Sequence, residues 1–187
     1  MKNINKIDLL YDQKKIKPGI EDIIPEFLKG VNKNIALNFV SYLNDIKMKP
    51  KWASANVWKV DLKKKAFCRI ILPHCEHIFY NKKSSDKTSW KNSWIVSLYL
   101  RGREEYKNFN INNELIEFIC NNVFYCLQCR NPCHGKKPGK DIIVFDKEIK
   151  NICWGRPLMW VYNPGKDEIE KIKKLFEYEF NLNGFTI

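Results

Sequence analysis

The spacing of apolar residues changes from a helical period to a strand period and back along this chain, and this order limits the fold class. Residues 34–48 place Ala36, Val40 and Leu43 on one helical face, and Pro50 ends the run. The order predicts an α+β fold, with a mainly antiparallel sheet of four to six strands and helices packed on one face. The expected later elements are helices over residues 112–125 and 166–180 and strands over residues 55–62, 66–72, 93–100, 141–145 and 158–162.

The length and composition predict a folded protein. At 187 residues, with 44% hydrophobic and 13% aromatic residues, the chain is long enough to bury a core. We expect a basic N-terminal arm over residues 1–19 and a single α+β domain over residues 20–187. We expect no signal peptide and no membrane span, because no apolar run approaches the roughly 20 residues needed to cross a bilayer. These features, with an odd count of seven cysteines, favour a cytoplasmic protein with reduced thiols.

The cysteines form a cluster with the chemistry of a metal site. Residues 126–134 read CLQCRNPCH, at the start of a cysteine-rich loop expected over residues 126–140. A Cys-x-x-Cys pair, a third cysteine four residues on and an adjacent histidine suit tetrahedral zinc. We predict a structural zinc site in which three loop cysteines are joined by His134 or Cys153. The predicted ligands are Cys126, Cys129, Cys133, His134 and Cys153. A redox dithiol and simply buried, reduced cysteines remain alternatives.

The positive charge is concentrated in the first half of the chain. Residues 1–93 hold 19 basic and nine acidic groups, a net of +10, whereas residues 94–187 hold 14 and 12, a net of +2. Tryptophans are interleaved with lysines in the first half, a combination that single-stranded nucleic acid binding uses. The alternatives are tryptophans that fill a core or line a pocket, and a solvated lysine face that reflects composition. The candidate binding residues are Trp52, Trp58, Trp90, Trp94, Lys63, Lys64 and Lys65.

Two parts of the chain carry a resemblance to known proteins. The first contains WASANVW at residues 52–58 and SWIV at residues 93–96, and the second contains IIVFDKE at residues 142–148 and IEKIKKL at residues 169–175. Over about two thirds of its length, the chain resembles uncharacterised small bacterial proteins of the YdhG-like type. The resemblance implies a compact α+β domain and no particular chemistry. The cysteine-rich loop is not part of that general pattern.

The sequence favours a binding protein over an enzyme. It has no glycine-rich phosphate loop, no Gly-x-Ser-x-Gly elbow and no His-Glu-x-x-His pair. We therefore expect a non-catalytic binding or regulatory module with a structural zinc site and a basic, Trp-bearing face for an anionic partner such as single-stranded nucleic acid. The alternative is a small-molecule sensor or an enzyme that uses an aromatic pocket, with the cysteines as a redox dithiol. Salt distinguishes these two hypotheses. The affinity for nucleic acid should fall steeply as salt rises, because phosphate contacts release counterions, whereas binding in an aromatic pocket should depend little on salt.

Overall fold

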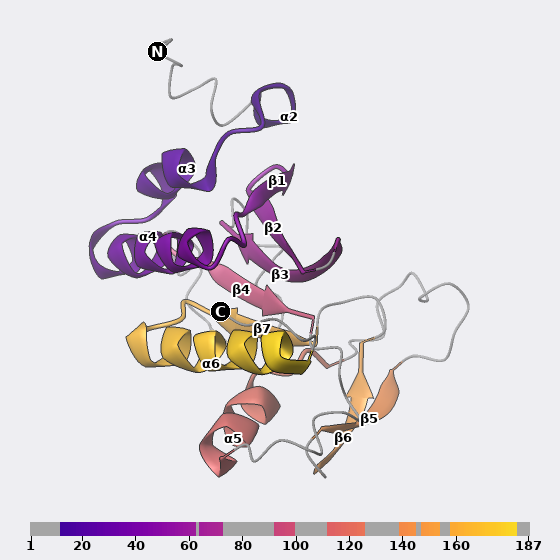
Figure 1. The fold of residues 1–187 in the computed structure, drawn as a ribbon. Helices are drawn as coiled ribbons and strands as arrows, with labels where there is room; N and C mark the ends of the chain where they lie inside the picture. The colour runs from indigo at the N-terminus through magenta and orange to yellow at the C-terminus, as the bar shows by residue number, and fades with distance from the viewer. Residues whose placement is uncertain are drawn as a thin grey trace. The chain divides into compact units, whose positions relative to one another are not determined.

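The architecture is that of a computed structural model, shown in Figure 1. It describes residues 12–62, 64–72, 92–99, 112–125, 139–144, 147–153 and 158–182. The chain divides into two compact units. The N-terminal unit comprises Met1–Val96 with Tyr162–Lys166, and the C-terminal unit comprises Ser97–Val161 with Asp167–Ile187. The single domain expected over residues 20–187 stays a prediction.

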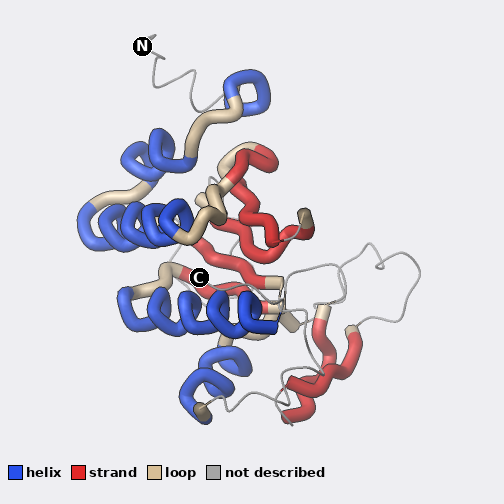
Figure 2. Tube along the Cα trace, viewed as in Figure 1, coloured by secondary structure: helices blue, strands red, loops and turns tan. Residues whose placement is uncertain are grey.

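The described helices and strands confirm the α+β class (Figures 1 and 2). An antiparallel sheet of five strands has the order β1-β2-β3-β4-β7, and a second sheet pairs β5 with β6. The strands are β1 (Lys51–Ser54), β2 (Val57–Leu62), β3 (Lys65–Ile71), β4 (Ile95–Leu98), β5 (Lys140–Val144), β6 (Lys147–Ile152) and β7 (Met159–Tyr162). The helices are α2 (Gln13–Ile16), α3 (Ile20–Phe27), α4 (Gly30–Asp45), α5 (Asn113–Asn121) and α6 (Lys166–Leu182).

Helix α4 packs one apolar face into the core of the N-terminal unit. Its buried side chains are Ala36, Phe39, Val40 and Leu43, which recur at the spacing of an amphipathic helix. The ring of Phe39 lies 6.3 Å from the ring of Trp94, just before β4. The helix begins at Gly30 rather than at residue 34, and it ends at Asp45 rather than at residue 48.

A tight turn joins β1 to β2. The turn residues are Ala55 and Asn56, and Asn56 has a left-handed φ of 57°, which asparagine tolerates better than most residues. Trp52 lies directly opposite Trp58, and Ser54 lies opposite Val57, with a bulge between the two pairs. The expected strand over residues 55–62 therefore starts too early, because β2 begins at Val57 and the preceding residues form the turn. Strand β1 is not among the strands that the sequence predicts.

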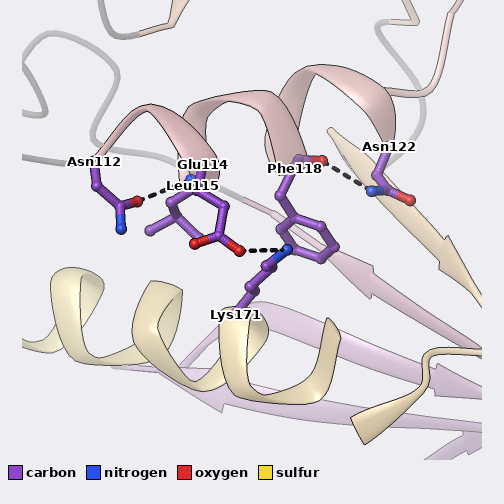
Figure 3. Close-up of polar contacts among 6 residues, drawn as sticks. All are labelled: Asn112, Glu114, Leu115, Phe118, Asn122 and Lys171. Atoms are coloured by element: carbon purple, nitrogen blue, oxygen red, sulfur yellow. Dashed lines mark hydrogen bonds and ion pairs between the residues drawn. The ribbon is translucent and has the colours of Figure 1, made fainter. Parts of the chain in front are cut away.

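Helix α5 begins at a side-chain cap. The Asn112 side chain accepts a hydrogen bond from the backbone N–H of Leu115 at 2.9 Å, as Figure 3 shows, and so satisfies a donor at the helix start. The prediction that this helix runs to about residue 125 is wrong, because α5 ends at Asn121. Val123 and Tyr125 instead form isolated antiparallel bridges to Met159 and Ile152. Strand pairing thus overrides the local helical pattern.

An ion pair links α5 to α6 within the C-terminal unit. Lys171 Nζ lies 2.8 Å from Glu114 Oε1 and 5.8 Å from the centre of the Phe118 ring (Figure 3). The hydrogen bond from Lys171 holds the pKa of Glu114 below its ordinary value, and the same bond raises the pKa of Lys171. Helix α6 confirms the helix expected over residues 166–180. In the part of the chain that the structure describes, no helix is long and apolar enough to cross a membrane.

Candidate anion-binding surface and cysteine region

Two of the four tryptophans predicted to stack bases, Trp58 and Trp94, are not exposed. Trp58 and Trp94 are both 0% exposed. The indole N–H of Trp58 donates to the backbone oxygen of Pro18 at 3.0 Å. A base needs an open ring face to stack on, and neither Trp58 nor Trp94 offers one in this conformation. We therefore assign them a structural role. Trp52 is half-buried, and Trp90 lies outside the described residues.

Lys64, one of the three lysines predicted to accompany these tryptophans, lies in a turn away from Trp58. Lys64 is exposed in the turn between β2 and β3, where it has a left-handed φ of 64°. The end of β2 that leads into this turn lies about 13 Å from Trp58, at the usual rise of a strand. Lys65 is the first residue of β3, and Lys63 lies outside the described residues. The structure does not bring Lys64 together with the tryptophans.

A different set of basic residues is aligned across the sheet. Lys51 on β1 lies directly opposite Lys59 on β2, and Lys59 lies directly opposite Arg69 on β3. Directly paired residues project from the same face of a sheet. We call these three residues the cation row. With strands about 4.8 Å apart, the row spans about 10 Å. Lys51 is exposed, and Lys59 and Arg69 are partly exposed.

Charged residues close to the cation row in sequence change the local charge. Lys49 is exposed between the buried residues Met48 and Pro50, two positions before Lys51. On β2, the Lys59 Nζ atom lies 3.1 Å from Asp61 Oδ2, and the two side chains are 41% and 15% exposed. Asp61 therefore offsets part of the charge of Lys59. Lys51 and Arg69 add two further basic side chains to the row.

The cation row was missed because the sequence does not reveal strand register. The three residues are separated by turns and by a bulge between Val60 and Asp61, so their alignment follows only from the pairing of three strands. One signal was present in the sequence. Polar residues at alternate positions of a strand, such as Lys59 and Asp61, indicate its solvent-facing side. That alternation identifies the solvent-facing side of β2, but it does not identify which residues of β1 and β3 lie opposite.

Most of the predicted zinc ligands lie outside the described residues. These are Cys126, Cys129, Cys133 and His134. Cys153 is described, and it is 8% exposed. Its backbone N–H donates to the oxygen of Phe124 at 3.2 Å, next to the bridge between Tyr125 and Ile152. The fold thus holds Cys153 beside the segment that leads directly into the cysteine-rich loop.

Cys68 does not have the surroundings of a reactive or ligating thiol. Cys68 on β3 is fully buried, and burial alone raises the pKa of its thiol far above the ordinary value. It therefore stays protonated and behaves as a small apolar side chain. Cys120, on α5, is half-buried. Within the described ranges, no group of three or more His, Cys, Asp or Glu side chains is arranged to hold a metal ion.

Comparison of the chain with protein-family models, with curated proteins and with solved structures gives no match.

Proposed function

We propose that this protein is a non-catalytic module that binds the phosphate backbone of a nucleic acid through the cation row. The observation that carries the proposal is the direct opposition of like charges across two successive strand pairs, Lys51 with Lys59 and Lys59 with Arg69. Like charges placed opposite one another destabilise a sheet. A polyanion that lies along the row can contact all three basic side chains on the same face of the sheet.

Protection of a sheet edge does not explain the row. Lysine on an edge strand discourages unwanted strand pairing, and this accounts for Lys51 on β1. Lys59 and Arg69 lie on β2 and β3, which are inner strands of the sheet, so edge protection gives no reason for their charge. Arginine can also bind phosphate through two parallel hydrogen bonds. Such contacts position a nucleic acid without reading its bases, so the expected binding is independent of sequence.

Salt dependence provides the test. Binding of a fluorescent single-stranded homopolymer would be measured by anisotropy between about 50 and 200 mM salt, the range over which such contacts weaken strongly. Each neutralised phosphate contributes about 0.7 to the slope of log affinity against log salt for a single strand. Replacing the whole row, as K51Q, K59Q and R69Q together, should reduce the slope by about 2.

A matched control distinguishes the effect of the cation row on binding from the effect of the protein's net charge. The combination K147Q, K150Q and K174Q removes the same charge at three exposed lysines of the C-terminal unit. This control should keep the slope of the unmodified protein. Equal losses in the two triple variants would show that binding follows net charge alone, and would contradict the proposal. The proposal also fails if the unmodified protein binds no nucleic acid at the lowest salt. Melting curves establish that each variant is folded.

We also propose that a structural zinc ion is held by Cys126, Cys129 and Cys133, with His134 or Cys153 as the fourth ligand. The support is the position of Cys153, whose backbone is hydrogen-bonded to Phe124. Cys126 follows Phe124 by two residues, and two extended residues span at most about 7 Å. The thiolate and imidazole donors suit zinc. Such an ion would tie the end of β6 to the segment that follows α5.

Metal analysis and chelation test the zinc proposal. The purified protein should contain one zinc ion per chain, and a chelator should lower its melting temperature, because zinc binding in such sites contributes on the order of 10 kcal/mol to folding. The variants C126S and C129S should lose the metal, whereas C68S should retain it because Cys68 is buried in β3. Metal-free protein with an unchanged melting temperature after chelation would contradict the site.

A further inference from the structure

A buried glutamine fastens the N-terminal segment to the turn between β1 and β2. Gln13, on the four-residue helix α2, is 1% exposed, although glutamine is mostly found at protein surfaces. Its Nε2 atom donates to Asn56 Oδ1 at 2.6 Å, and its Oε1 atom accepts from the backbone N–H of Asn56 at 2.8 Å. The indole N–H of Trp52 also points to Gln13 Oε1, at 3.5 Å. One side chain thus contacts both the turn and β1.

A second anchor lies five residues further on. Pro18 is buried, and its backbone oxygen accepts the hydrogen bond from the Trp58 indole. Trp52 and Trp58 are directly opposite each other, so both indoles project from one face of the β1–β2 hairpin. Both indole N–H groups point to residues 12–19, which we call the strap. The strap therefore covers this face of the hairpin, which we call the tryptophan face.

The local structure of the strap gives it little stability of its own. Helix α2 has only four residues and no side-chain hydrogen bond at its N-cap, and helices this short are unstable in isolation. Lys17 ends the helix with a left-handed φ of 48°. Lys14, Lys15 and Lys17 are exposed. Contacts with the rest of the N-terminal unit therefore hold the strap in place, and they include the hydrogen bonds made by Gln13 and Pro18.

We propose that the strap is a releasable cover that controls access to the tryptophan face of the hairpin. Lysines and tryptophans alternate along β1 and β2, so the cation row lies on the opposite face from Trp52 and Trp58. Among the strands that the structure describes, β1 is an edge of the sheet. A single strand that passes around this edge can place phosphates on the row and a base on Trp52 once the strap has left. A duplex cannot, because its bases are paired and stacked.

The ligand in this inference rests on the proposed function, whereas release of the strap is tested without any ligand. The variant Q13A removes the side chain that holds the strap to Asn56. The variant N56G removes the Asn56 side chain, and glycine keeps the left-handed turn. Trypsin should cut the strap on the order of tenfold faster in either variant, since the lost hydrogen bonds raise the open population. The double variant should be cut no faster than Q13A alone, because Q13A already removes both hydrogen bonds and N56G removes only the one to Asn56 Oδ1.

A control and two outcomes decide whether the strap is releasable. The variant N34A, at an exposed position of α4, should be cut at the rate of the unmodified protein. Quenching of tryptophan fluorescence by acrylamide should increase in Q13A, and W52F should remove most of that increase. An unchanged cleavage rate would overturn the proposal. Global unfolding of both Q13A and N56G, seen by circular dichroism, would also overturn it, because the strap would then be part of the core.

The consequence for binding is specific to single strands. A base stacked on an aromatic side chain typically strengthens binding about fivefold or more, so Q13A should bind a thymine homopolymer at least about fivefold more tightly. The added change W52A should abolish this gain, and affinity for a matched duplex should stay constant. An equal gain for the duplex would contradict the stacking role. If no nucleic acid binds any variant, the proposed function fails, and the cleavage and quenching results still decide on the strap.

Discussion

Replacement of Trp58 by phenylalanine distinguishes a structural tryptophan from a ligand-binding one. Trp58 is 0% exposed, and its indole N–H donates to Pro18 at 3.0 Å. The variant W58F leaves the Pro18 oxygen without this donor, which costs about 1–3 kcal/mol for a buried group. The smaller ring also leaves unfilled volume, which adds about 1 kcal/mol. We therefore expect W58F to lower the free energy of unfolding by about 2–4 kcal/mol.

Trp52 provides the matched comparison on the neighbouring strand. It is half-buried, and its indole nitrogen lies 3.5 Å from Gln13 Oε1, which is longer than a typical N–H···O hydrogen bond. The variant W52F should therefore cost less than about 1 kcal/mol. Urea denaturation followed by circular dichroism gives both free energies by linear extrapolation. A W58F variant as stable as the unmodified protein, or a W52F variant that loses more, would refute the reasoning.

Three further predictions concern the C-terminal unit and β3. N112A should destabilise the protein by about 1 kcal/mol in urea denaturation, because the N-cap of α5 is lost. Cys68 should resist alkylation in the folded protein and react after unfolding, as mass spectrometry would show, since burial keeps its thiol protonated. The stability difference between the unmodified protein and E114Q should be present above the ordinary Glu114 pKa of 4.5. It should fade as pH falls through the lower pKa of the folded state, because protonation breaks the Lys171 pair.

Hydrophobic period alone predicts several elements of this fold. Ala36, Val40 and Leu43 identify α4 because a helix buries one stripe of side chains, and the same argument identifies α6. The end of α5 could not be predicted in this way. Residues 122–125 continue an apolar pattern, yet Tyr125 pairs with Ile152 across the unit. Pairing with a distant strand is a tertiary effect, and it is absent from any local window of sequence.

The candidate surface shows why residue proximity along a chain is a poor guide to a shared face. Trp58 and Lys59 are neighbours in sequence, and this suggested a surface on which rings stack bases while lysines bind phosphates. In a strand, neighbouring side chains point to opposite faces, so the same adjacency separates them. The residues that share a face with Lys59 are its cross-strand partners Lys51 and Arg69. An interleaved Lys-Trp pattern in a strand can therefore serve one ligand only where that ligand passes around a sheet edge. Within the described sheet β1 is such an edge, and the strap contacts its tryptophan, Trp52.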